Sequence, residues 1–186
     1  MWADECLAKL LTDHDHEFVT VLDVGSGHGE QATAFRQAGK IVTETDLSRD
    51  GDYLLQRFPV PFDLVWASHV LEHQPNAHAF LLTLAQDCKP GGLIAITVPP
   101  LKHAIVGGHV SLWNAGLLLY HLALVGVDCR NARVKTYGYN ISVIVRNNRL
   151  PLPELRWDAG DIGRLSSLLP DFAIEGFNGN IAEYNW

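Results

Sequence analysis

Val21-Leu-Asp-Val-Gly-Ser-Gly-His-Gly-Glu30 is the stretch of this sequence that decides the fold. It begins with a short apolar run in which two residues are β-branched, a composition typical of a buried parallel strand: Val21, Leu22 and Val24. Three glycines follow at alternate positions, where they allow a tight turn and a close approach to a ligand: Gly25, Gly27 and Gly29. The pattern becomes helical from Gln31, and the first N–H groups of a helix lack partners and favour an anionic group. The stretch therefore predicts a strand, a nucleotide-cofactor loop and a helix.

The residues that flank the glycines indicate which cofactor the loop binds. A dinucleotide fingerprint needs a third small residue at the position of Glu30, so that the helix can press on the strand. Asp23 before the loop and Glu30 behind it would repel a pyrophosphate, but they suit a ligand with an amino group. The spacing therefore argues against NAD.

Length and composition set limits on the class of protein. A chain of 186 residues with 47% hydrophobic residues suits one soluble globular domain with a sizeable core. Its net charge of -7 disfavours binding of nucleic acid through phosphates. Three cysteines without a CxxC pair fit reduced thiols, no secretory signal is visible, and no apolar run is long enough for a bilayer. We expect a cytoplasmic protein that binds neither nucleic acid nor membrane.

Periodicity and turn residues predict alternating helices and strands. Helices are expected over residues 3–12, 30–38, 76–86 and 111–126, and strands over 21–24, 41–45, 64–67, 93–98, 133–137 and 140–146. Only fifteen residues separate Asp46 from Phe62, which is little room for a crossover helix and a strand. Either this helix is reduced to a turn, or a third strand is a stub at residues 53–55.

The C-terminal part departs from this alternation. Pro151 and Pro153 mark a break, after which a helix is expected to end at Pro170. Residues 172–177 and 181–186 are predicted to form a hairpin around Asn178-Gly179, a pair that favours a tight turn. We expect one domain over 1–186, with an α/β core over 1–147 and an extension over 148–186 that packs on the core.

Two further blocks, Phe62-Asp-Leu-Val with His69-Val-Leu-Glu-His73, and Lys89-Pro-Gly-Gly92, accompany the glycine loop. Together the three blocks resemble the class I S-adenosylmethionine-dependent methyltransferases of the small-molecule type, over residues 21 to about 146. The resemblance implies an α/β fold with a Rossmann-like sheet of seven strands. This sheet is mainly parallel with an antiparallel terminal strand, and here it is shortened around strand three.

The same resemblance implies the cofactor, S-adenosyl-L-methionine, and its contacts. Asp46 lies at the end of the second strand, where a carboxylate can accept hydrogen bonds from both ribose hydroxyls. The alternatives are that Asp46 caps a turn, or that Glu44 takes its place. Asp52 is expected near the adenine. The predicted cofactor-binding residues are Asp23, Gly25, Ser26, Gly27, Gly29, Asp46, Leu47, Asp52 and Ser68.

Transfer of a methyl group to a hydroxyl benefits from a base, and histidine titrates in the right range. His109 is the first candidate because its loop belongs to the acceptor side in the family, and His103 and His69 follow. The alternative role for His109 is a hydrogen bond to a backbone carbonyl that orders the loop. Trp113, Tyr137, Tyr139, Asn140 and Trp186 are candidates for an acceptor pocket or for the core.

The block His69-x-x-Glu72-His73 also resembles the Glu-x-x-Glu-His metal ligands of ubiquinone-pathway and small-RNA methyltransferases, with His69 in place of the first glutamate. His69, Glu72 and His73 could hold a divalent ion, with His103 or His109 as a fourth ligand. The same block occurs in metal-free relatives, and we expect no metal.

The sequence thus predicts a methyltransferase that uses S-adenosylmethionine and acts on a small molecule or sugar, with oxygen chosen as the acceptor atom from family frequency. The alternative is a non-catalytic S-adenosylmethionine-binding domain that acts through a protein partner.

Overall fold

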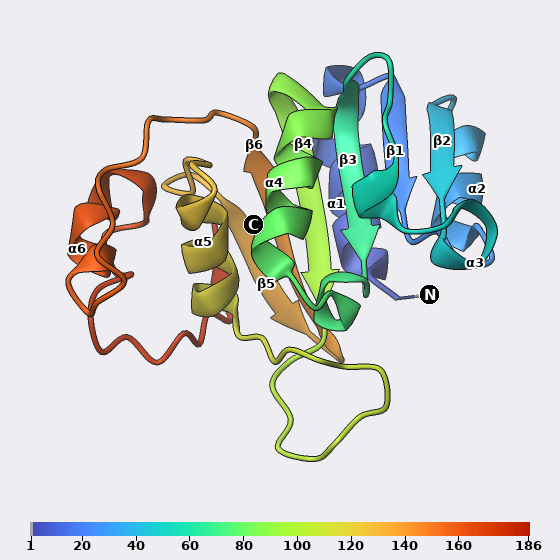
Figure 1. Cartoon of the computed structure of the whole chain (residues 1–186). Coiled ribbons are helices and arrows are strands. Elements are labelled where there is room, and N and C mark those ends of the chain that lie inside the picture. The colour runs from blue at the N-terminus through green and yellow to red at the C-terminus, as the bar shows by residue number, and fades with distance from the viewer. Residues whose placement is uncertain (1) are drawn as a thin grey trace.

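The computed structural model describes residues 2–186 and contains one sheet in the strand order β2-β1-β3-β4-β6-β5-β7 (Figure 1). Its strands are β1 Thr20–Val24, β2 Ile41–Thr45, β3 Phe62–Ser68, β4 Cys88–Val98, β5 Arg133–Tyr137, β6 Asn140–Arg146 and β7 Glu183–Tyr184. The first four strands pair in parallel, whereas β6 pairs antiparallel with β4 and β5, and β7 pairs antiparallel with β5. The predicted seven-stranded α/β sheet with an antiparallel end is confirmed.

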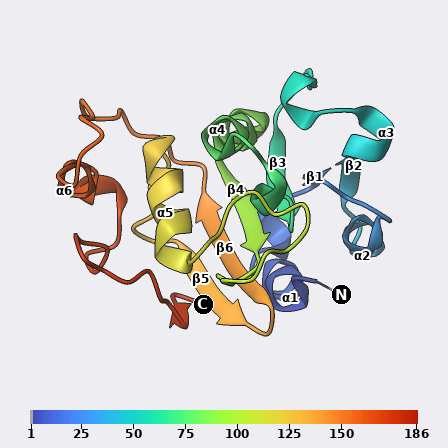
Figure 2. The same ribbon diagram turned by 60° about the horizontal axis from the view of Figure 1, so that its bottom comes forward.

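Helices cover both faces of the sheet: α1 Asp4–Asp13, α2 Glu30–Gln37, α4 Ala77–Asp87 and α5 Ala115–Leu124. Figure 2 shows α4 and α5 on one face and α1 and α2 on the other. The alternation of β4 explains these two layers, because Ile94 and Ile96 belong to the hydrophobic cluster under α4 and α5, whereas Leu93 and Ala95 belong to the cluster under α1 and α2.

The segment between β2 and β3 contains no strand. It holds a short helix, α3 Leu47–Asp50, and a 3₁₀ turn, Tyr53–Leu55. The stub strand considered at residues 53–55 is therefore wrong, and the turn is the alternative that holds. Asp52 caps this turn by accepting a hydrogen bond from Leu54 N at 3.0 Å, and Tyr53 anchors it by packing against Phe80.

Two predicted boundaries shift for local reasons. The helix expected over 111–126 begins at Ala115 because the side chain of Asn114 accepts the Leu117 N–H at 2.7 Å and caps the helix there. Strand β4 begins at Cys88, so the predicted Pro-Gly-Gly turn lies within a strand of irregular register rather than before it.

The C-terminal part differs more from the prediction. The predicted helix is broken into α6 Asp161–Arg164 and a 3₁₀ turn, Ser166–Leu168. The hairpin around Asn178-Gly179 is wrong: residues 172–177 form no strand, and Glu183–Tyr184 pairs with β5. Gly179 O instead accepts the Gly116 N–H at 2.9 Å, so the turn residues pack on the start of α5. Buried leucines of this region, among them Leu165 and Leu168, belong to the hydrophobic cluster under α4 and α5.

The parallel strands place their carboxyl ends at one edge of the sheet, which is where open α/β sheets bind ligands. In Figure 1 the loop that follows β4 projects beyond this edge, and the N-terminal end of the described chain lies beside it. None of the helices within residues 2–186 is long and apolar enough to span a membrane.

Candidate active site

The loop between β1 and α2 depends on glycines with a left-handed backbone. Gly25 has φ 74° and Gly29 has φ 76°, a region that costs other residues about 1–2 kcal/mol. Gly25 N–H donates to Thr45 O at 2.8 Å and holds the loop against the end of β2. A Cβ on Gly25 would lie 2.3 Å from Val70 Cγ2. Backbone conformation and close packing therefore both require glycine at position 25.

Asp46 takes the capping role that the sequence suggested as one alternative, and it also bonds to the glycine loop. Its Oδ1 accepts hydrogen bonds from Ser48 N at 3.0 Å and Ser48 Oγ at 2.6 Å, which caps α3. Its Oδ2 accepts the Gly27 N–H at 3.0 Å and so joins the glycine loop to β2. The bonds from Ser48 lower the pKa of Asp46 and keep the carboxylate ionised. Glu44, the alternative ribose ligand, instead pairs with Arg36 at 2.6 Å.

A cavity of about 440 Å³ opens at this edge of the sheet, within the usual range for small-ligand sites. Four predicted cofactor residues line it: Gly25, Asp46, Leu47 and Asp52. Leu47 is 76% exposed, so it offers apolar surface at the cavity. The remaining lining residues were not predicted to bind cofactor: Val24, Thr45, Tyr53, His69, Val70, His73, Gln74 and Pro75. Several of them belong to the turn after β3, which is far from the glycine loop in the sequence but lies beside it in the structure.

Five predicted cofactor residues do not line the cavity: Asp23, Ser26, Gly27, Gly29 and Ser68. Asp23 is buried under the loop, and its Oδ2 has no hydrogen-bond partner. Burial, followed by the nearby charge of Glu44, raises the pKa of Asp23 to about 7. A buried carboxylate with one unpartnered oxygen suits a cationic group, but the contact of these five residues with the cofactor stays a prediction.

His69 lies immediately after β3 with φ 55°, an unusual backbone conformation for a residue with a side chain. Its Nδ1 is 3.2 Å from Glu72 Oε1, at ion-pair distance but without hydrogen-bond alignment. Its Nε2 is 2.9 Å from Asn140 Oδ1. Burial lowers the pKa of His69, but Glu72 and Asn140 together outweigh burial and raise it. Strained residues held by several contacts are concentrated at functional sites.

Glu72, His73 and His109 form the group that the structure brings together for a metal ion. One ligand atom from each lies within 4.8 Å of the others. Glu72 is fully buried, and neither of its carboxylate oxygens has a hydrogen-bond partner. His73 Nδ1 lies 2.8 Å from Gly108 O, so Nδ1 donates and the lone pair of Nε2 is available. His69 is not a member of this group, in contrast to the ligand set considered from the sequence.

The fold places the other candidates for the acceptor side, His103, His109, Trp113 and Tyr139, in different surroundings. His103 is exposed and belongs to no metal-capable group among residues 2–186. The loop-ordering contact considered for His109 is made by His73, against whose ring His109 packs at 4.9 Å. Trp113 is buried in the core. Tyr139 lies beside His69, with ring centroids 6.2 Å apart.

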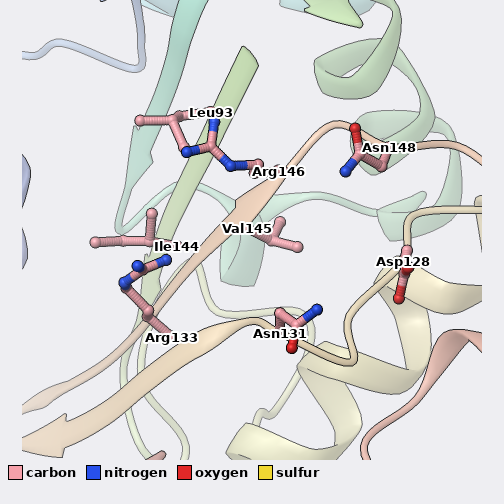
Figure 3. A pocket seen from close by; sticks show the side chains of 8 residues that line it. All are labelled: Leu93, Asp128, Asn131, Arg133, Ile144, Val145, Arg146 and Asn148. Atoms are coloured by element: carbon pink, nitrogen blue, oxygen red, sulfur yellow. The ribbon is translucent and has the colours of Figure 1, made fainter. Parts of the chain in front are cut away.

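A second cavity, of about 260 Å³, lies at the opposite edge of the sheet (Figure 3). Arg133 begins β5 and Arg146 ends β6, so both lie far along their strands from the glycine loop. Arg146 is already paired with Glu17. The cavity lined by Gly25 and Asp46, by contrast, lies at the carboxyl ends of the parallel strands.

Comparisons with known proteins found similar methyltransferases. Two ubiquinone biosynthesis O-methyltransferases are similar in sequence. The one from Maricaulis maris (strain MCS10) is 30% identical over 100 residues, which cover 42% of this chain and 39% of that protein. The one from Xylella fastidiosa (strain 9a5c) is 29% identical over 130 residues, which cover 58% of this chain and 47% of that protein. The chain thus spans less than half the length of these curated relatives.

Solved structures share the fold. They include the Burkholderia thailandensis 1,6-didemethyltoxoflavin-N1-methyltransferase with bound S-adenosylhomocysteine (TM-score 0.64, 16% identity, 77% of each chain). They also include an Archaeoglobus fulgidus SAM-dependent methyltransferase (TM-score 0.63, 16% identity, 77% of this chain and 93% of that one). At these identities the likeness shows the fold alone. The methyltransferase domain family matches residues 3–144, and because this match covers more than half of the chain, the protein belongs to that family, the class I methyltransferases whose cofactor is S-adenosylmethionine.

Proposed function

We propose that this domain transfers the methyl group of S-adenosylmethionine to an oxygen atom of a small molecule or sugar. The observation that carries the proposal is the adjacency of two features at one sheet edge. Gly25, Asp46 and Asp52, which are predicted cofactor residues, line one cavity, and His69 and His73 line the same cavity. The similarity to two O-methyltransferases supports oxygen as the acceptor atom.

The cofactor supplies an electrophilic methyl group on a sulfonium, and the residues of the chain supply binding and orientation. Asp46 would accept a hydrogen bond from the ribose, while the exposed side chain of Leu47 offers apolar contact for the adenine. Asp23, buried with an unpartnered oxygen, would balance the charge of the α-amino group. The left-handed glycines allow the loop to lie against the amino-acid end of the cofactor.

A histidine would take the proton of the acceptor hydroxyl. Of the three sequence candidates, His69 is the one that lines the cavity. Its Nδ1 faces Glu72 and its Nε2 faces Asn140 Oδ1, so His69 would act as the base only when Nε2 turns from Asn140 toward the acceptor hydroxyl. His109, the first candidate from the sequence, packs against the His73 ring and does not line this cavity. We therefore rank His69 first, His109 second and the exposed His103 third.

A divalent cation held by Glu72, His73 and His109 is the second proposal for activating the acceptor. Its support is that one ligand atom of each residue lies within 4.8 Å of the others, and that neither oxygen of the buried Glu72 carboxylate has a hydrogen-bond partner. Nitrogen and carboxylate ligands suit several transition metals. A bound cation would lower the pKa of an acceptor hydroxyl, and His69 would then be dispensable.

One panel of assays separates these proposals. Formation of S-adenosylhomocysteine is measured with phenols, carboxylates and glycosides as acceptors, with and without EDTA. Turnover that survives EDTA and is lost in His69→Asn supports the histidine base. Turnover that is lost with EDTA, and is restored by a divalent metal only when Glu72 is intact, supports the cation. Tight cofactor binding without turnover on any acceptor favours the non-catalytic alternative.

A further inference from the structure

A group of three aromatic rings, one exposed and two half-buried, includes His69 at the carboxyl edge of the sheet. The Trp2 ring lies 5.0 Å from the His69 ring and 5.9 Å from the Tyr139 ring, measured between centroids. The His69 and Tyr139 rings are nearly parallel, with 22° between their planes. Trp2 is nevertheless 56% exposed. We call Trp2, His69 and Tyr139 the aromatic wall.

The aromatic wall is assembled from distant parts of the chain by specific polar contacts. Asn140 Oδ1 accepts the Ala3 N–H at 3.3 Å and lies 2.9 Å from His69 Nε2. Gln31, in the helix after the glycine loop, donates from Nε2 to Trp2 O at 3.1 Å. The turn before α1 therefore contacts both α2, through Gln31, and the start of β6, through Asn140.

Two residues at the aromatic wall have left-handed backbone angles, which residues with a side chain rarely adopt. Ala3 has φ 57° and His69 has φ 55°, and both residues contact the same buried amide oxygen of Asn140. Residues with a Cβ adopt such angles where the surrounding structure imposes them. Asn140 thus sets the position of Trp2 relative to His69, the residue that also lines the cofactor cavity.

A cation lies over the same surface. Lys102 Nζ is 4.1 Å from the centroid of the Tyr139 ring. Within the described residues 2–186 no carboxylate forms an ion pair with Lys102, although the chain has a net charge of -7. An exposed ammonium group beside aromatic faces favours a ligand that is both flat and acidic.

We propose that the methyl acceptor is a planar aromatic molecule with an acidic substituent, bound by the aromatic wall and Lys102, and that Asn140 is the positioning residue of this site. The proposal rests on the proposed methyl transfer. The ring of the acceptor packs against Trp2 and Tyr139, its acidic group pairs with Lys102, and its hydroxyl points toward the cofactor cavity.

Calorimetry with S-adenosylhomocysteine present tests the proposal with three probes of similar size. The probes are 3-hydroxybenzoate, the neutral 3-hydroxybenzamide, and the saturated 3-hydroxycyclohexanecarboxylate. We expect 3-hydroxybenzoate to bind about fivefold tighter than the saturated acid, because ring stacking is worth about one kcal/mol. We expect it to bind about threefold tighter than the amide, as for an exposed ion pair.

Variants test which residue causes the preference for the aromatic ring and which causes the preference for the acidic group. Trp2→Leu and Tyr139→Leu should each reduce the preference for the aromatic ring, and Lys102→Met should remove the preference for the acid. Asn140→Ala should weaken 3-hydroxybenzoate about tenfold without changing the affinity for S-adenosylhomocysteine, as expected from the loss of a positioned aromatic contact. Asn140→Asp keeps an acceptor oxygen for the Ala3 N–H and should restore binding. The exposed Asn131→Ala is the matched control.

The outcomes separate this proposal from the proposed function. Equal binding of the three probes, or unchanged preferences in both Trp2→Leu and Lys102→Met, would overturn the aromatic acceptor while cofactor binding stands. A protein that does not bind S-adenosylhomocysteine would overturn the proposed function and this site together.

Discussion

Replacement of Asp46 tests the cofactor site most directly, and the structure sets the size of the effect. A carboxylate offers about four acceptor positions, and three are used by Ser48 N, Ser48 Oγ and Gly27 N. One position remains for a ribose hydroxyl, unless the hydroxyl of Ser48 turns away. A hydrogen bond to a charged group contributes about 1.5–3 kcal/mol. Asp46→Ala should therefore weaken S-adenosylhomocysteine roughly 10- to 150-fold.

The assay is calorimetric titration with two ligands, S-adenosylhomocysteine and an analogue that lacks both ribose hydroxyls. The wild-type protein should prefer the hydroxylated ligand, and Asp46→Ala should bind both alike. Comparing the ligands removes the separate cost of losing the cap on α3, which is about 1 kcal/mol and affects both equally. Equal losses for the two ligands in Asp46→Ala would refute the ribose contact and leave Asp46 as a cap alone.

Asp50 provides the matched control for this experiment. Its carboxylate lies in the same short helix and accepts the Asp46 N–H at 2.9 Å, but Asp50 does not line the cavity. Asp50→Asn should change the affinity by less than about threefold, the range of an exposed polar contact.

Three further predictions concern stability. The pKa of Asp23 is raised by burial to about 7, so folding of the free protein should lose up to about 4 kcal/mol as pH rises from 4 to 7, and Asp23→Asn should flatten this slope in urea titrations. The pKa of Asp63 shifts in the opposite direction. Partial burial raises it, but Lys89 and the backbone donors at the start of β1, Val19 and Thr20, hold it below the ordinary value. Asp63→Asn should therefore destabilise the protein at pH 7 and much less near pH 2, as followed by thermal unfolding. Gly25→Ala should cost about 1–2 kcal/mol or more, because of the left-handed backbone and the contact with Val70.

Each stability prediction has a contrary result. If the stability of Asp23→Asn still falls as pH rises from 4 to 7, another group causes the fall. If Asp63→Asn loses the same stability at pH 7 and near pH 2, Asp63 makes no ionic contribution to stability. Gly107 is the control for Gly25, since its backbone is not left-handed and a Cβ there would meet no atom within 4 Å. Equal costs at these two positions would contradict the packing argument.

The glycine loop and the elements that flank it were predictable because their signals are local. A strand, a glycine turn and a helix follow one another within residues 21–38, and each depends on neighbours a few positions away. For the same reason Asp46 and Asp52 could be assigned to strand and turn ends, and the structure places both at the cavity. The shortened segment before β3 also followed from a residue count.

The contacts of the candidate acceptor residues could not be predicted in the same way. His69 and Asn140 are 71 positions apart, and Ala3 and Asn140 are 137 apart, so no local pattern indicates that they share one contact. The histidine loop shows the same limit, because the position of His109 beside His73 depends on how the long connection after β4 folds back.

The C-terminal hairpin shows local preference overruled by packing. Asn178-Gly179 favours a tight turn, but a hairpin gains little when its strands have no sheet to join. Here Gly179 packs on the start of α5, and Glu183–Tyr184 pairs with β5 instead. The sequence by itself determined the order of strands and helices and the identity of the cofactor loop, since these depend on short-range periodicity and backbone freedom. Only the tertiary structure decided which histidine meets the cavity, what orients it and where the chain ends pack, because those contacts join residues that are far apart in the chain.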